Sequence, residues 1–169
     1  TRVAHEILEH NKGGTNLCLI GIRSGGDLLA ELLQARIKEI EGIEVPLGTV
    51  DITMYRDDLA ARGNLPIGKT DIPFPLDGKQ VVLVDDVLYT GRTTRAGLDS
   101  VIDYGRPKKV ELVVLIDRGH RELPIQADYV GKYVETAANE VVEVRIPPID
   151  EDEAVYLSTF ELLQEASTS

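Results

Sequence analysis

Short apolar runs alternate with amphipathic segments along this chain. The runs Asn16–Ile22, Val81–Val84 and Val110–Ile116 consist mostly of apolar residues, which is typical of strands buried on both faces of a sheet. Apolar residues recur at helical spacing from Asp27, the expected N-cap, to Ile40, and again from Thr93 to Tyr104. Strands and helices in this alternation predict an α/β fold with a central, mainly parallel sheet flanked by helices.

Weaker patterns predict elements nearer the two ends of the chain. One apolar stripe along Thr1–His10 predicts a first helix, and partial alternation over Val45–Tyr55 predicts another strand. Asp128–Lys132 and Val141–Ile146 are expected to be closing strands, joined by a polar turn. The length of 169 residues predicts one domain, residues 1–169.

Two stretches depart from this alternation. Residues 59–79 are rich in glycine and proline, and so long an irregular stretch predicts a flexible loop that closes over substrate. A disordered or hairpin surface arm is the alternative. Residues 150–169 predict an acidic tail and a short terminal helix, Ala154–Leu163, without a chemical role.

Composition narrows the class of protein. Eighteen basic and 29 acidic residues give a net charge of −11, which opposes nonspecific adhesion to nucleic acid, so RNA binding would require a local basic face. The single cysteine, Cys18, suits a reducing compartment. The apolar runs are too short to cross a bilayer and no signal-peptide pattern is present, so a cytoplasmic protein without membrane contact is expected. Residues before Thr1 are expected to be missing, because the first helix begins without a lead-in.

The polar residues after Val81–Val84 predict a ligand site. Asp85 and Asp86 stand at the carboxyl end of this strand, and the turn Thr90–Thr94 then opens a helix. Hydroxyl groups, a glycine and the unpaired N–H groups of a helix start suit a phosphate. The carboxylates repel phosphate, so they are expected to meet sugar hydroxyls, Mg²⁺ or both. Phosphoribosyl pyrophosphate carries these groups close together and is the ligand that the stretch predicts.

An earlier turn between strand and helix carries Arg23, Ser24, Gly25 and Gly26. Alone, these residues are most simply an ordinary glycine-bearing turn. Next to a phosphate turn, they predict a loop whose N–H groups bind pyrophosphate.

Other ligand sites are disfavoured by what the chain lacks. Response-regulator receivers also have adjacent aspartates at a strand end, but there the pair follows the first strand. Neither a Walker-type Gly-x-x-x-x-Gly-Lys-Ser/Thr motif nor Gly-x-Gly-x-x-Gly is present, which disfavours nucleoside triphosphate and dinucleotide sites.

Three segments carry a resemblance to a known family. Residues 84–93 resemble the signature of type I phosphoribosyltransferases, and together with residues 52–58 and 117–125 they resemble the PyrR family, pyrimidine operon regulators that are also uracil phosphoribosyltransferases. The resemblance implies the type I phosphoribosyltransferase fold, with a small hood and a flexible loop. It also implies synthesis of UMP and pyrophosphate from uracil and phosphoribosyl pyrophosphate with Mg²⁺, UMP-dependent binding of pyrimidine operon leader mRNA (transcriptional attenuation), and a homodimer or homotetramer.

The motifs and the resemblance together give each candidate residue a role. The catalytic candidates are Asp85, Asp86 and Arg56. Both aspartates are also expected to serve Mg²⁺, through an indirect contact. For Arg56, an ion pair with a nearby aspartate is the alternative. The 5-phosphate would bind to Tyr89, Thr90, Gly91, Arg92, Thr93 and Thr94, and pyrophosphate to Arg23, Ser24, Gly25 and Gly26. The base would be read by backbone groups of Leu115, Ile116, Asp117 and Arg118. RNA would meet Thr1, Arg2, His5, Arg121 and Lys132.

Two alternatives to this dual function stay open. A phosphoribosyltransferase without RNA binding is suggested by the acidity and by Gln126, His10 and Gly25, which stand where RNA-binding members carry arginines. A solvated His5 and an Arg121 bound in a local ion pair are the corresponding structural interpretations. A purine phosphoribosyltransferase is the other alternative, which the segment Arg118–Pro124 disfavours.

Overall fold

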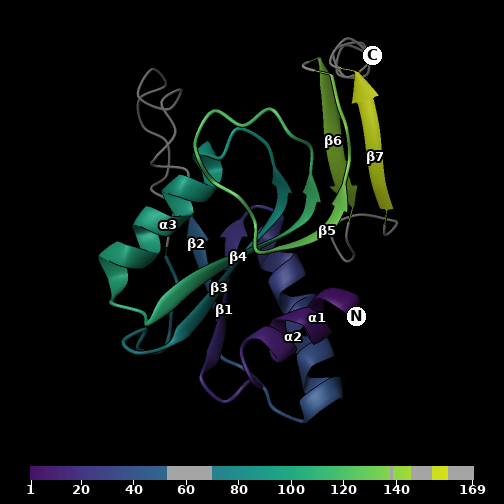
Figure 1. Ribbon diagram of the computed structural model, residues 1–169. Coiled ribbons are helices and arrows are strands. Elements are labelled where there is room, and N and C mark those ends of the chain that lie inside the picture. The colour runs from purple at the N-terminus through teal and green to yellow at the C-terminus, as the bar shows by residue number, and fades with distance from the viewer. Residues whose placement is uncertain (53–69, 138, 146–153, 160–169) are drawn as a thin grey trace.

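The computed structural model describes residues 1–52, 70–137, 139–145 and 154–159 of the chain (Figure 1). The helices in this part are α1 (Arg2–His10), α2 (Gly26–Glu41) and α3 (Arg92–Tyr104). The strands are β1 (Leu17–Arg23), β2 (Leu47–Asp51), β3 (Gln80–Leu88), β4 (Lys109–Asp117), β5 (Tyr129–Tyr133), β6 (Glu140–Arg145) and β7 (Ala154–Thr159). Among these residues, no helix combines the length and the apolar character needed to cross a bilayer.

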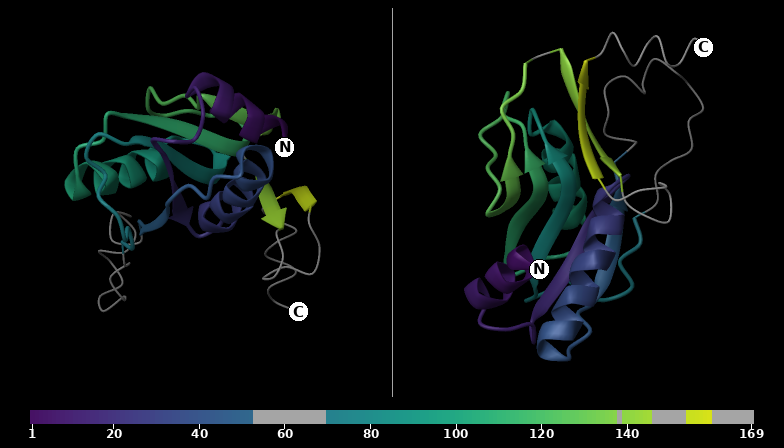
Figure 2. Two further views of the ribbon diagram at one scale, coloured as in Figure 1. Left: turned by 90° about the horizontal axis from the view of Figure 1, so that it is seen from below. Right: turned by 90° about the vertical axis from the view of Figure 1, so that its right-hand side faces the viewer.

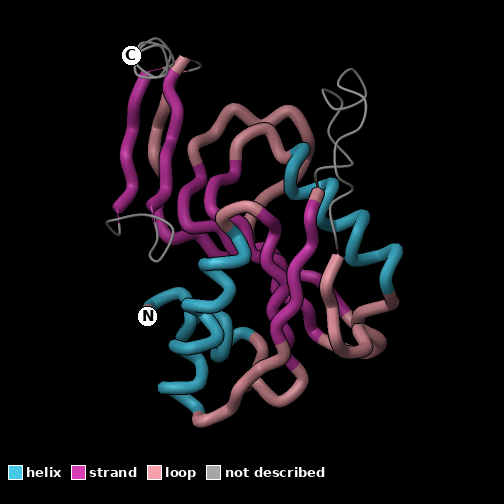
Figure 3. The backbone as a smooth tube through the Cα atoms, turned by 180° about the vertical axis from the view of Figure 1, so that it is seen from behind, coloured by secondary structure: helices cyan, strands magenta, loops and turns pink. Residues whose placement is uncertain are grey.

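Five strands, among those drawn in magenta in Figure 3, form one sheet in the order β2-β1-β3-β4-β5. Every neighbouring pair in this sheet is parallel. The predicted parallel α/β sheet is therefore confirmed. From β1 the chain passes through α2 to β2 at one edge, whereas from β3 it passes through α3 to β4 in the opposite direction. The strand order thus reverses between β1 and β3, which is where open α/β sheets bind ligands.

Helices cover both faces of this sheet (Figure 2). Val82 and Val84 of β3 lie in a core shared with α1 and α2, whereas Val81 and Leu83 lie in a core shared with α3. Successive side chains of a strand point to opposite faces, so a continuous apolar run is what a strand between two helical layers requires.

The end of the described chain corrects two predictions. Ala154–Thr159 is a strand rather than the start of a helix, and it pairs antiparallel with β6 in a separate two-stranded sheet. Hence β6 does not close the main sheet with β5, as the polar turn between them suggested. Val155, Tyr156 and Thr159 belong to residue types that favour strands, and pairing with β6 outweighs the helical spacing of a short segment. The rest of the predicted tail and helix lies outside the described residues.

The predicted flexible loop, residues 59–79, is only partly described. Residues 59–69 lie outside the described part. In the remainder, Ile72 and Leu76 are 3% and 2% exposed and belong to the core on the α3 side. Asp71 and Thr49 exchange two backbone hydrogen bonds, of 2.8 and 2.9 Å. Residues 70–79 are therefore a packed segment, because two apolar side chains anchor an otherwise irregular backbone.

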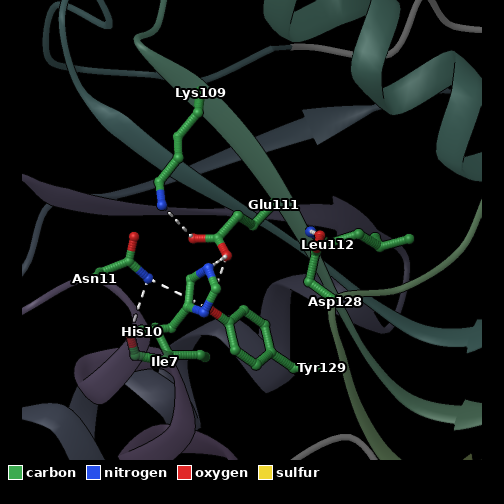
Figure 4. A network of polar contacts seen from close by, with 8 residues as sticks. All are labelled: Ile7, His10, Asn11, Lys109, Glu111, Leu112, Asp128 and Tyr129. Carbon is green, nitrogen blue, oxygen red and sulfur yellow. Dashed lines mark hydrogen bonds and ion pairs between the residues drawn. The ribbon is translucent and has the colours of Figure 1, made fainter.

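A buried polar network fastens α1 to the main sheet (Figure 4). The Glu111 carboxylate of β4, 6% exposed, accepts a hydrogen bond of 2.7 Å from the Tyr129 hydroxyl of β5. His10 Nε2 lies 3.4 Å from the same carboxylate oxygen, and Lys109 Nζ lies 3.4 Å from the other. Asn11 Nδ2 donates to the Tyr129 hydroxyl at 3.4 Å. Burial, followed by the hydrogen bond to Glu111, raises the pKa of Tyr129 far above its ordinary value.

Candidate functional site

The two predicted ligand turns meet at the point where the strand order reverses. The turn after β1 begins at Arg23, the turn after β3 begins at Tyr89, and β1 and β3 are adjacent parallel strands. The carboxyl ends of both strands therefore lie side by side, and each is followed by the N-terminus of a helix. Two helix N-termini at the ends of adjacent strands suit a ligand that is phosphorylated at both ends.

The first turn is held by Asp27. Its carboxylate accepts a hydrogen bond of 3.0 Å from the Gly25 N–H and lies 3.8 Å from Arg23 Nε. The peptide bond between Arg23 and Ser24 is cis, and Gly25 has φ +107°, a conformation that favours glycine. Gly25 is the N-cap of α2, so the prediction of Asp27 as N-cap is wrong. Asp27 lies two residues later, in the first turn of α2, and the bend of the loop brings its carboxylate back to the N–H of Gly25.

The first turn also packs directly against the acidic end of β3. A Cβ placed on Gly26 would lie 2.2 Å from the Val84 carbonyl oxygen and 3.0 Å from Asp85 Cα. A Cβ placed on Gly25 would lie 2.4 Å from Asp86 Oδ2. Glycine at both positions allows the proposed pyrophosphate turn and the proposed catalytic strand to touch.

The two aspartates differ in their surroundings. Asp85 is only 3% exposed, and its Oδ1 accepts a hydrogen bond of 2.8 Å from the Asp86 N–H. Asp86 is partly exposed beside Gly25, and its own Oδ1 accepts a hydrogen bond of 2.8 Å from the Val87 N–H. Of the pair, Asp86 is the carboxylate that a ligand in the first turn can reach.

The second turn presents an uncapped helix start. Gly91 is the N-cap of α3 at φ +93° and has no side chain to cap the helix, although Thr90 Oγ1 accepts a hydrogen bond of 3.3 Å from the Arg92 N–H. The Glu122 and Leu123 N–H groups, from the segment after β4, both donate to the Thr90 carbonyl oxygen, at 2.9 and 3.1 Å, and so hold the turn in place. Thr94 is 4% exposed, and its Oγ1 has no hydrogen-bond partner among the described residues. An orphaned hydroxyl at an uncapped helix start fits an anion such as a phosphate.

Two arginines near this turn already have partners. Arg92 Nε lies 2.9 Å from Glu122 Oε1 on the exposed side of the turn. Arg121 donates to the carbonyl oxygens of Ile125 and Tyr89, each at 2.7 Å, and pairs with Asp117 at 2.7 Å. For Arg121 the structure thus contains the local ion pair that was the alternative to RNA contact.

The residues predicted to read the base lie at the carboxyl end of β4. The Arg118 N–H donates to the Leu88 carbonyl oxygen at 3.1 Å, and the Asp117 carbonyl oxygen accepts from the Val134 N–H at 2.9 Å. Leu115 is partly exposed and Ile116 is buried. Base recognition by backbone groups at Leu115–Arg118 stays a prediction. The Arg118 N–H and the Asp117 carbonyl oxygen already have hydrogen-bond partners, so each would have to bind the base in addition.

The Arg118 side chain has a role that its sequence position did not predict. It is 6% exposed, and its guanidinium lies 4.1 Å from the centroid of the Tyr89 ring. It also donates to Thr136 Oγ1 and to the carbonyl oxygens of Ala137 and Glu140. Contacts between residues about twenty positions apart leave no periodic signal in the sequence. The sequence therefore did not identify Thr136 and Glu140 as partners of Arg118.

Most of the residues predicted to meet RNA lie at one edge of the main sheet. Thr1, Arg2 and His5 are exposed at the start of α1, and Lys132 is exposed on β5. Arg2 Nη2 donates to two carbonyl oxygens of β5, at 3.1 and 2.6 Å, and so ties the two elements together. The remaining candidate, Arg121, is held at the carboxyl end of β4 by Asp117.

A Mg²⁺ site was predicted at the acid pair. In the described part of the chain, no cluster of three or more His, Cys, Asp or Glu side chains could hold a metal ion by itself. Mg²⁺ commonly binds one or two carboxylates together with waters and substrate phosphates. Asp86, a partly exposed carboxylate beside the predicted pyrophosphate turn, fits a site of that kind. The catalytic candidate Arg56 lies outside the described residues.

Comparisons with known proteins agree with this geometry. The phosphoribosyl transferase domain family matches residues 1–147. The bifunctional protein PyrR of Pelotomaculum thermopropionicum is 60% identical over 158 residues, which are 93% of this chain and 87% of that protein. The bifunctional protein PyrR of Deinococcus deserti is 55% identical over 165 residues, 97% of this chain and 90% of that protein.

Solved structures share the fold at lower identity. A hypoxanthine phosphoribosyl transferase of Trypanosoma cruzi superposes with a TM-score of 0.74 at 21% identity, over 99% of this chain and 89% of that chain. A purine phosphoribosyltransferase of Pyrococcus horikoshii gives 0.56 at 23% identity, over 79% of this chain and 78% of that chain. At such identities these matches concern the fold alone.

Proposed function

This chain belongs to the phosphoribosyltransferase family, and we propose that it is a uracil phosphoribosyltransferase that also regulates pyrimidine genes by UMP-dependent binding of leader mRNA. Relatives that are 55–60% identical over most of the chain are bifunctional PyrR proteins. The purine phosphoribosyltransferases are 21–23% identical in the matches described above, so a purine substrate is not favoured.

One observation carries the enzymatic proposal: two turns that each open a helix flank a carboxylate at the point where the strand order reverses. The turn Thr90–Thr94 would hold the 5-phosphate, with the Thr94 hydroxyl among its donors. The turn Arg23–Gly26 would hold the pyrophosphate. Phosphoribosyl pyrophosphate places its ribose between these groups, next to Asp86.

The reaction forms a bond from uracil N1 to C1 of the ribose and breaks the bond from C1 to pyrophosphate. Positive charge grows on the ribose and negative charge on the leaving group, so positioning and electrostatics supply most of the acceleration. Asp86 would accept hydrogen bonds from ribose hydroxyls and favour the cationic ribose. Buried Asp85 would hold the Asp86 backbone in place through its hydrogen bond of 2.8 Å. Bound Mg²⁺ would neutralise charge on the pyrophosphate.

The regulatory role has its own surface. The exposed residues Thr1, His5 and Lys132 lie on α1 and β5, which Arg2 and the Glu111 network hold together. Because the whole chain carries a net charge of −11, RNA affinity must come from such a local surface and fall steeply with salt.

Two experiments test the proposal. Incubation with phosphoribosyl pyrophosphate, Mg²⁺ and each free base in turn should give UMP from uracil and little nucleotide from purines, and no UMP above background would overturn the enzymatic proposal. A gel shift with a pyrimidine leader RNA, with and without UMP, should show a complex that UMP strengthens. No shift at low salt would remove the regulatory proposal and leave the enzyme.

A further inference from the structure

We propose that Arg118 is a positioning residue that couples the phosphate turn to the segment leading into β6, so that binding of the 5-phosphate orders the base side of the site. This inference rests on the proposed function. It concerns the side chain of Arg118, which makes no contact that the reaction itself requires.

The Arg118 guanidinium joins two segments that are far apart in sequence. One of its faces lies on the ring of Tyr89, the residue that opens the phosphate turn, 4.1 Å from the ring centroid. Its edge donates to Thr136 Oγ1 at 3.2 Å and to the carbonyl oxygens of Ala137 and Glu140 at 3.3 and 2.5 Å. A movement of the Tyr89 ring would therefore shift Arg118 and, through its hydrogen bonds, the start of β6.

His120 strengthens the same connection. Its ring and the Tyr89 ring form a T-shaped pair with centroids 5.8 Å apart, and its Nε2 is hydrogen-bonded to the Thr136 carbonyl oxygen. Thr136 Oγ1 in turn donates to the Arg118 carbonyl oxygen at 3.0 Å. Tyr89 is thus held by two side chains, and both of these also hold Thr136.

The charge of Arg118 makes this arrangement sensitive to substitution. Arg118 is 6% exposed and forms none of the ion pairs found between described side chains. Carbonyl oxygens, a hydroxyl and an aromatic face compensate the cation instead. A planar guanidinium can lie on a ring and donate in its own plane at the same time, whereas a lysine ammonium has no such plane.

The test compares Arg118→Lys with Arg36→Lys, a matched control on α2 whose arginine pairs only with Glu39 among the described contacts. For Arg118→Lys the KM for uracil should rise roughly 10- to 100-fold, while the KM for phosphoribosyl pyrophosphate should change less than about 3-fold. The reason is that the substitution displaces the residues on the base side of the site and leaves the phosphate turn in place. Thr136→Val removes the hydroxyl that accepts from Arg118 Nε and donates to the Arg118 carbonyl oxygen, and it should shift the KM for uracil in the same direction by a smaller factor. Equal changes in both KM values, or none, would overturn the inference.

Hydrogen exchange gives a readout that does not depend on turnover. In the wild-type protein, phosphoribosyl pyrophosphate without base should slow amide exchange at Ala137 and in β6, and Arg118→Lys should abolish this protection while Arg36→Lys keeps it. Protection that survives in Arg118→Lys, or that is absent from the wild type, refutes the coupling. Failure of the wild type to make UMP would refute the proposed function instead, and ribose 5-phosphate would then replace phosphoribosyl pyrophosphate in the exchange experiment.

Discussion

Substitution of Gly26 by alanine should disable the site while leaving most of the fold intact. Gly26 is the first residue of α2, and its backbone conformation is one that alanine adopts readily. The added Cβ would lie 2.2 Å from the Val84 carbonyl oxygen, where real contacts of this kind exceed 3.0 Å. The obstacle is backbone on both sides, so no side chain can rotate away to make room.

The expected size of the effect follows from this overlap. The turn and the end of β3 must separate by roughly 0.8 Å, and a misplacement of about 1 Å in a catalytic site costs on the order of 100-fold in rate. Overpacking of this kind lowers the free energy of unfolding by about 1–3 kcal/mol. We therefore expect kcat/KM for phosphoribosyl pyrophosphate to fall about 100-fold in a protein that still folds cooperatively.

Gly42→Ala is the matched control, at the opposite end of the same helix. Gly42 has φ +73°, and a Cβ there would meet nothing within 4 Å. An L-residue in this conformation costs about 1–2 kcal/mol, so the control should lose comparable stability but keep its activity. Urea unfolding and initial rates of UMP formation measure the two quantities. If Gly26→Ala kept kcat/KM within about 3-fold of the wild type, or if the control lost as much activity, the close contact of turn and strand would not matter for function.

Three further substitutions test separate parts of the structure. Asp86→Asn keeps the acceptor for the Val87 N–H, so unfolding in urea should be unchanged while UMP formation falls by about 100-fold or more; a variant with wild-type rates would exclude the carboxylate from catalysis. Tyr129→Phe removes the hydrogen bond to buried Glu111 and should lower the free energy of unfolding by about 1–3 kcal/mol at pH 7. Because the pKa of Tyr129 is raised in the folded protein, the wild type should lose this extra stability as the pH rises above about 10. Parallel pH profiles of the unfolding free energy in the two proteins would contradict this. Burial raises the pKa of the Cys18 thiol to about 11, so the stability that this group contributes is fully present below pH 9. At pH 10 the free energy of unfolding should be lower by about 1 kcal/mol in the wild type, but not in Cys18→Ala. A thiol reagent that labels the folded protein at pH 8 would show that the thiol is not buried.

The main sheet was predictable because its strands are buried on both faces. The apolar runs around β1, β3 and β4 have no polar alternation, and only a sheet between two helical layers can bury them. The turns after β1 and β3 were predictable for a related reason. Polar residues that directly follow a buried strand must lie at its carboxyl end, and adjacent parallel strands bring two such ends together.

Contacts distant in sequence were not predictable in the same way. Residues 70–79 were expected to be a loop, but Ile72 and Leu76 pack into the core. Two isolated apolar residues among glycine and proline form no periodic pattern, so the sequence did not indicate this packing. The strand β7 forms because β6 offers a partner, not because its own pattern demands it. In each case the deciding interaction comes from a residue elsewhere in the chain.

The acid pair shows how much depends on strand geometry. Asp85 and Asp86 are adjacent in sequence, which suggested one shared task of binding ribose hydroxyls. Neighbouring residues of a strand point to opposite faces, so Asp86 follows Val84 toward α2 and the Gly25 turn, whereas Asp85 follows Leu83 toward the α3 side and is 3% exposed. A ligand at the first turn would therefore meet one carboxylate, that of Asp86, while Asp85 accepts a hydrogen bond from the Asp86 N–H. Removal of Asp86 should then act mainly on the binding and transfer of the ribose, and removal of Asp85 mainly on the placement of Asp86.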